Sequence, residues 1–170
     1  MRFLTPEQWQ AWCVERHVPL VDSDHRRPAV GAPHYHTKSV SVPSDSGAKV
    51  ALAQELVSLV SSDGCALVLL DEWGVWPSSQ HMPLLNRFRE ALGERRPLIE
   101  APGHLSASTD TEDAISVVAM ALLFIWDCYG ISSDGCRAFH LSHDEYCYVS
   151  AREASVLEKM ASEVGGVSRA

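Results

Sequence analysis

The stretch Cys65-Ala66-Leu67-Val68-Leu69-Leu70 is a continuous apolar run between Gly64 and Asp71. A strand that is buried on both faces of a parallel sheet has this kind of sequence, because neither of its faces meets water. Glycine and aspartate are common at the ends of strands. The run therefore predicts a central strand over residues 65–70.

Helices and strands are predicted to alternate on both sides of this run. A helix over 44–61 has an apolar stripe at helical spacing, and a second helix is predicted over 79–92. Two further strands are predicted over 35–42 and 98–101. Such alternation is typical of a parallel sheet whose crossover connections are helices.

The longest apolar stretch, 114–126, is interrupted by a single serine. It lies within a helix that is predicted to begin at a capping box of Thr109 and Glu112 and to run to about Tyr129. Because apolar residues surround most of its circumference, residues 117–126 should form the most buried helix of the fold.

Capping boxes and turn residues predict the helices, loop and hairpin near the two ends of the chain. A capping box at Thr5 begins a first helix, and residues 19–34 form a long, proline-containing loop. A hairpin with strands over 137–141 and 145–150 precedes a last helix, which frays at 165–170. The predicted fold is a single α/β domain, with a mainly parallel sheet of about three strands plus a C-terminal antiparallel hairpin, flanked by helices.

The charge balance narrows the range of partners. The 170 residues include 22 acidic side chains and 14 lysines and arginines, which gives a formal charge of −8. Nucleic-acid binding depends mostly on lysine and arginine, so a nucleic-acid partner is not expected. Apolar residues make up 46% and charged residues 21% of the chain, as in a globular protein.

The sequence also predicts a cytoplasmic location. No apolar segment of signal-peptide length lies at the N-terminus, and the 114–126 stretch is shorter than the roughly 20 residues that span a bilayer. The five cysteines are an odd number, which favours reduced thiols in a cytosolic compartment. No contact with a membrane is expected.

Four polar residues are candidates for general acid–base chemistry. Asp71 and Glu72 follow the strand at 65–70, and Glu100 and His104 accompany the strand predicted over 98–101. Ligands of open α/β sheets gather beyond the carboxyl ends of the strands. If the two strands are neighbours, two or more carboxylates and a histidine would meet at one cleft.

Two tryptophans, Trp73 and Trp76, lie in the same loop. Their rings are candidates for stacking on a ligand or for anchoring a protein partner. The alternative is that both rings pack over the end of the sheet and have a structural role.

No metal site and no cofactor are predicted. The eight histidines include His34, His36, His140 and His143, but no Cys-x-x-Cys or His-Glu-x-x-His spacing is present. The chain also lacks a Gly-x-Ser-x-Gly elbow, a glycine-rich phosphate loop and a dinucleotide fingerprint.

Acidic residues are concentrated between positions 110 and 145, where Arg137 is the one basic residue among lysines and arginines. Asp134, Asp144 and Glu145 fall in predicted turns, where no helix dipole accounts for them. They are candidates for contact with a basic protein partner. The alternative is an ordinary solvated surface.

Three segments carry a resemblance to known sequences: Trp73-Gly74-Val75-Trp76-Pro77-Ser78-Ser79, Arg87-Phe88-Arg89 and Glu100-Ala101-Pro102-Gly103-His104. Over roughly residues 70–145 the chain resembles a group of uncharacterised bacterial proteins. The resemblance implies a small bacterial cytosolic protein and no particular catalytic residue. In architecture and acidity the chain is also similar to immunity proteins that neutralise toxins, including the barstar type, although fold alone does not fix function.

These observations favour a non-enzymatic protein that binds another protein, with an immunity or antitoxin role against a basic toxin. A small enzyme that uses Asp71, Glu72, Glu100 and His104 is the alternative. A third hypothesis is a structural or assembly role through an exposed hairpin face that carries His140, Tyr146 and Tyr148. The sequence does not predict the oligomeric state.

Overall fold

Seven strands form one sheet in the computed structural model, which describes residues 1–21, 27–31, 33–62, 64–74 and 77–167. The order across the sheet is β1-β4-β3-β5-β6-β7-β2, and every pair of neighbours is antiparallel. The strands are β1 (Arg2–Leu4), β2 (His36–Ser41), β3 (Cys65–Leu70), β4 (Gly103–Ala107), β5 (Cys128–Ser132), β6 (Arg137–Ser142) and β7 (Tyr146–Ala151). The helices are α1 (Pro6–Glu15), α2 (Ser46–Ser61), α3 (Met82–Ala91), α4 (Thr111–Phe124) and α5 (Ala154–Val167), with short 3-10 helices η1 (Ser78–His81), η2 (Leu98–Glu100) and η3 (Ser108–Asp110).

The prediction of a mainly parallel sheet of about three strands is wrong. Helices α1, α2 and α4 do connect strands that run in the same direction, as crossover helices should. The connected strands are not neighbours, however, because an oppositely directed strand always lies between them. Strand β3, for example, separates β4 from β5.

The prediction of a central strand over 65–70 is confirmed. Strand β3 has these bounds and pairs with β4 on one side and β5 on the other. Its side chains alternate between two apolar cores: Val68 belongs to the larger one, whereas Leu67 and Leu69 belong to the smaller one. An unbroken apolar run is required here because both faces of the strand are covered.

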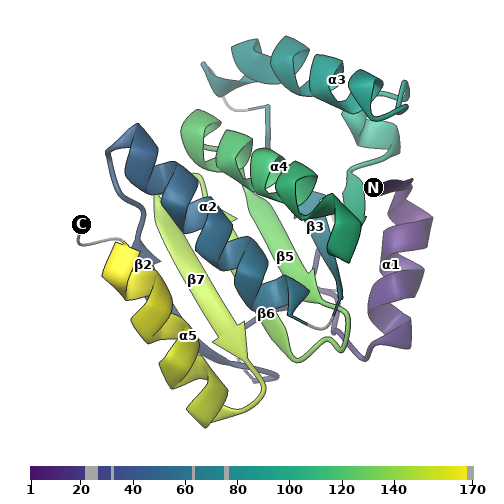
Figure 1. The fold of residues 1–170 in the computed structure, drawn as a ribbon. Coiled ribbons are helices and arrows are strands. Elements are labelled where there is room, and N and C mark those ends of the chain that lie inside the picture. Colours follow the sequence, from purple (N-terminus) through teal and green to yellow (C-terminus); the bar gives the residue numbers. More distant parts are fainter. Residues whose placement is uncertain (22–26, 32, 63, 75–76, 168–170) are drawn as a thin grey trace.

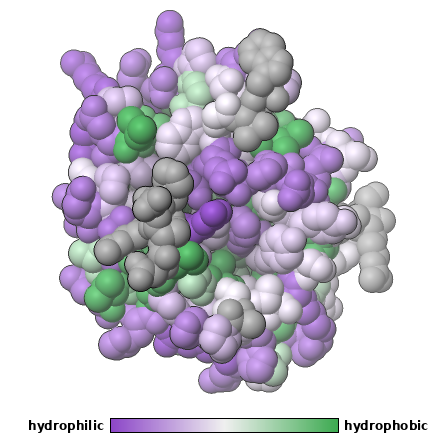
Figure 2. All heavy atoms as spheres, turned by 180° about the vertical axis from the view of Figure 1, so that it is seen from behind, coloured by the Kyte–Doolittle hydropathy of each residue, from purple (hydrophilic) through white to green (hydrophobic). Residues whose placement is uncertain are grey.

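Helices cover the two faces of the sheet unequally (Figure 1). Helices α2, α4 and α5 lie on one face and enclose the larger core. On the other face, α1 contributes Trp9, Trp12 and Cys13 to the smaller core. The predicted capping box at Thr5, with Gln8, is present at the start of α1. Seen from behind, the molecule presents a largely hydrophilic surface (Figure 2).

Two predicted elements have different bounds or a different structure. Residues 98–100 form the 3-10 helix η2, and the strand follows at Gly103–Ala107. The helix predicted to reach Tyr129 ends at Phe124, and the segment Cys128–Ser132 is strand β5. Most of the residues predicted to form the most buried helix are nevertheless buried in α4.

Of the predicted loop over 19–34, residues 22–26 and 32 lie outside the described residues, and the segments 19–21 and 27–29 pair with each other. Leu20 and Pro28 form an antiparallel bridge, the N–H of Val21 donates to the carbonyl of Arg27 at 2.9 Å, and the N–H of Ala29 donates to that of Pro19 at 2.8 Å. At the other end, α5 continues through Gly165 to Val167, so the helix does not end where fraying was predicted. No helix in the described part of the chain combines the length and hydropathy needed to cross a membrane.

Candidate functional site

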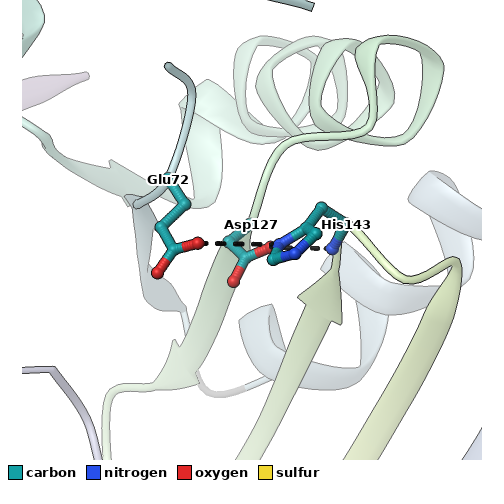
Figure 3. Close-up of side chains that lie close together, drawn as sticks. All are labelled: Glu72, Asp127 and His143. Carbon is teal, nitrogen blue, oxygen red and sulfur yellow. Dashed lines mark hydrogen bonds and ion pairs between the residues drawn. The ribbon is translucent and has the colours of Figure 1, made fainter. Parts of the chain in front are cut away.

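Three side chains that can bind a cation meet at one end of the sheet (Figure 3). Glu72 lies just beyond the end of β3, Asp127 just before the start of β5, and His143 in the turn between β6 and β7. The antiparallel order places these three positions at the same edge, because β3 and β6 end where β5 begins. We call these three residues the carboxylate–histidine cluster.

The backbone conformation at the end of α4 places Asp127 in the cluster. Ile125 has a left-handed backbone with φ of 58°, which is uncommon for a β-branched residue and ends the helix abruptly. The next residue, Trp126, is buried, and the N–H of Asp71 donates to the carbonyl of Asp127 at 2.9 Å. Asp127 is thereby fixed at the head of β5 with 3% of its surface exposed.

Asp127 binds His143 twice through one oxygen. Its Oδ1 accepts the backbone N–H of His143 at 2.7 Å and lies 2.7 Å from Nδ1 of the ring. Because a carboxylate only accepts hydrogen bonds, Nδ1 is the donor in the second contact. Oε2 of Glu72 lies 3.7 Å from the same Nδ1, so a single ring nitrogen faces two carboxylates.

These contacts shift the ionisation of both partners. Burial raises the pKa of Asp127, but the rings of His140 and His143 and the His143 N–H outweigh it, and the pKa lies below its ordinary value. The hydrogen bond to Asp127 and its negative charge raise the pKa of His143. Both shifts favour a charged carboxylate beside a cation.

A second histidine faces Asp127 from the sheet. His140 stacks between Tyr129 and Tyr148, with ring centroids 4.3 and 5.7 Å away. Its Nε2 lies 3.6 Å from Oδ2 of Asp127, which is beyond hydrogen-bond distance, and this buried atom has no hydrogen-bond partner. Asp127 therefore has one oxygen committed to His143 and the other facing an unsatisfied nitrogen.

The cluster has the donor set of a divalent-cation site. One ligand atom each from Glu72, Asp127 and His143 can be chosen so that all three lie within 4.8 Å of one another. Two carboxylates with an imidazole suit zinc, manganese or ferrous ions better than calcium or magnesium. Three protein ligands also leave coordination positions open to a further molecule.

The acid–base quartet predicted from the sequence is not assembled. Glu72 lies in the cluster and Asp71 adjoins it through its backbone, but Glu100 is exposed on η2. His104 is fully buried on β4, and burial, followed by the charge of Arg89, lowers its pKa to about 3. A histidine without contact with water cannot exchange protons with a bound substrate.

Of the two predicted tryptophans, Trp73 is half-buried and packs against the larger core. Trp76 lies outside the described residues. The position of Trp73 is compatible with both interpretations of this loop, because the ring combines packing with partial exposure.

The acidic residues predicted to face a partner do not share one surface. Asp144 and Glu145 are exposed in the turn between β6 and β7, at the cluster end of the sheet. Asp134 lies in the turn between β5 and β6, at the opposite end. There it accepts hydrogen bonds from the hydroxyl of Ser132 at 2.5 Å and from the N–H of Cys136 at 2.8 Å.

Sequence reasoning identified Glu72 and missed the pairing of Asp127 with His143. These two positions are 16 residues apart, and neither belongs to a recognised metal motif. The signal that was present was the gathering of His140, His143 and acidic residues near one predicted turn. His140, Tyr146 and Tyr148, predicted to form an exposed hairpin face, do lie on one face of β6 and β7. Only Tyr146 is exposed there, whereas His140 and Tyr148 are half-buried.

Comparison with known proteins identifies no relative: no family model, no curated protein and no solved structure matches this chain.

Proposed function

We propose that this chain binds a divalent transition-metal ion through Glu72, Asp127 and His143. The observation that carries the proposal is the convergence of two carboxylates on one ring nitrogen, Nδ1 of His143, at 2.7 and 3.7 Å. In the absence of metal, a proton on Nδ1 offsets one of the two negative charges. A divalent ion supplies more positive charge at the same place and satisfies the same three groups.

The open side of the cluster supports a catalytic rather than a purely structural ion. Asp127 is buried, whereas 45% of the Glu72 side chain and 36% of the His143 side chain are exposed. Closed structural sites surround their ion with four protein ligands, but here three leave room for a substrate oxygen or water. An ion bound in this way would polarise a substrate carbonyl or phosphoryl oxygen and so promote attack on the adjacent carbon or phosphorus, or would activate a bound water as the nucleophile.

Isothermal titration calorimetry with MnCl₂ and with ZnCl₂ tests the proposal. One ion should bind per chain, and Asp127→Asn or His143→Gln should weaken binding by about tenfold or more, since even partners of metal ligands have effects of that size. The control is His36→Gln, which changes an exposed histidine on β2. Absence of saturable binding, or equal binding by Asp127→Asn, would refute the proposal.

Protein binding is a second candidate function, in the form of an immunity or antitoxin role in the bacterial cytoplasm. It is supported by two exposed acids, Asp144 and Glu145, that lie at the same end of the sheet as half-buried Trp73. An aromatic anchor beside charged residues is common in protein interfaces. The five free cysteines agree with a reducing compartment.

A further inference from the structure

An arginine stands beside the carboxylate–histidine cluster. The backbone bonds at the base of the 19–34 loop fix Arg27, and its Nη1 lies 3.9 Å from Oε1 of Glu72. The hydroxyl of Tyr129, a buried residue whose ring stacks on His140, interacts with the Arg27 guanidinium and raises its pKa. The backbone therefore holds Arg27 at the cluster, with its side chain beside Glu72 and Tyr129.

The Arg27 guanidinium has N–H donors that remain available to a ligand. It carries five N–H groups, and its polar neighbours among the described residues are the Tyr129 hydroxyl and the carboxylates of Glu72 and Asp71. The contact with Glu72 is loose at 3.9 Å, and 40% of the Arg27 side chain is exposed. Because the planar guanidinium matches two oxygens of a carboxylate or a phosphate, these free donors form half of an oxyanion site.

The carboxylate of Glu72 lies between the Arg27 guanidinium and the His143 ring, and so indicates the size of an oxyanion that could contact both. One of its oxygens faces Arg27 and the other faces Nδ1 of His143, at the centre of the cluster. The arginine and the cluster are thus separated by the width of one carboxylate. An anion of similar size, lying beside Glu72, would reach both.

Without a cation, the local charge opposes an anion. Asp71, Glu72, Asp127 and Asp144 surround the position, against Arg27 and the His143 ring. A divalent ion that replaces the His143 proton lowers this net negative charge and offers an open coordination position to an oxygen. Anion binding should consequently depend on the metal.

We propose that Arg27 and the cluster-bound cation together bind an oxyanion, a phosphate or a carboxylate, of this protein's substrate. The inference rests on the proposed cation binding. The oxyanion places one oxygen on the cation and others on the guanidinium. The inference assigns the substrate to the class of small anionic molecules and gives residues 19–21 and 27–29 the role of positioning Arg27.

Calorimetry on the full chain tests the inference, with inorganic phosphate and acetate as the probes. Each anion is titrated into protein with and without bound Mn²⁺, and Mn²⁺ is titrated with and without each anion. Phosphate should bind tenfold or more tightly to the Mn²⁺-loaded protein, and by linkage it should raise Mn²⁺ affinity by the same factor. If acetate binds as well as phosphate, the site accepts a planar carboxylate. If phosphate alone binds, the site is specific for a tetrahedral oxyanion.

Two variants distinguish a specific role of Arg27 from a general effect of positive charge. Arg27→Gln should abolish the coupling, measured as the ratio of the Mn²⁺ affinities with and without phosphate. This ratio cancels any effect that loss of the contact with Glu72 has on Mn²⁺ binding alone. Arg2→Gln removes the same charge from the exposed face of edge strand β1 and should leave the coupling intact. Circular dichroism confirms that both variants are folded.

The outcomes distinguish this inference from the proposed function. If Mn²⁺ binds but neither anion does, or if Arg27→Gln retains the coupling, the inference is wrong and the cation site stands. If Mn²⁺ does not bind, the proposed function is wrong and the oxyanion site falls with it.

Discussion

The carboxylate of Asp127 holds His143 by two hydrogen bonds to one oxygen, one from the backbone N–H and one from the ring, each of 2.7 Å. One bond fixes the chain of the turn between β6 and β7, and the other fixes the ring on that chain. The same contact that could present His143 to a cation therefore also stabilises the hairpin. Effects on binding and on stability must be measured separately at this position.

Replacing Asp127 should separate these two roles. Asp127→Ala removes the oxygen that accepts both hydrogen bonds and leaves a part-buried N–H unsatisfied, so we expect a loss of about 1–3 kcal/mol in the free energy of unfolding. Asp127→Asn retains an acceptor for the backbone N–H and should lose less. Urea unfolding measures the two values; equal losses would show that the backbone bond contributes little.

Short-range signals correctly predicted several parts of the fold. The apolar run of β3 and the capping box at Thr5 depend on neighbouring residues, so the sequence alone identifies them. The start of β5 has no such signal. Ile125 ends α4 in a left-handed conformation that glycine or asparagine usually adopts, and the apolar pattern continues into the strand.

The order of the strands and the site depend on contacts that are distant in sequence. Strand β3 lies between β4 and β5 although it precedes both, and no local pattern specifies this insertion. Glu72 could be predicted because it follows a recognisable strand. The contact of Asp127 with His143 could not, because it requires both the missed strand β5 and the register of Cys128 opposite Leu141.

Gly130 provides a test of the pairing between β5 and β6. It lies opposite Phe139, and a Cβ at position 130 would come within 2.0 Å of the Phe139 ring. Gly130→Ala should therefore destabilise the protein by about 1–3 kcal/mol, because the buried ring must move. Gly31→Ala is the control, since a Cβ there meets nothing within 4 Å, and its effect should stay within about 0.5 kcal/mol. Urea unfolding that gives equal values for the two variants would contradict the predicted clash.

The second candidate function predicts a difference between the two ends of the sheet. Asp144→Asn with Glu145→Gln should slow association with a basic protein partner, such as the product of a neighbouring reading frame, at low salt and have little effect at high salt. Asp134→Asn at the opposite end should not change the rate. Association rates from surface plasmon resonance decide the matter: an unchanged rate in the double variant at low salt would leave these acids as a solubility feature.

His104 should make the protein less stable in mild acid. Its pKa is lowered from 6.5 to about 3 in the fold, so between these values the unfolded chain binds a proton that the folded chain does not. Unfolding is therefore favoured as the pH falls, by about 1.4 kcal/mol for each unit below 6.5. This contribution is absent above pH 6.5, where the ring is neutral in both states.

His104→Phe should remove this dependence, because phenylalanine does not titrate and can occupy the apolar site beside Phe3, whose ring centroid lies 5.3 Å from that of His104. Other groups also make the wild type less stable in acid, among them Asp127 and Glu94, whose lowered pKa values cost stability as they become protonated. The measurement is therefore the difference in unfolding free energy between variant and wild type, by urea denaturation at pH 7, 6, 5 and 4.5. That difference should shift in favour of His104→Phe by roughly 1.4 kcal/mol per unit below pH 6.5.

His36→Gln, at an exposed position on β2, should show no comparable trend. A constant difference between His104→Phe and wild type across this range would mean that His104 takes up its proton in the folded chain, and that the β4 core admits a charge.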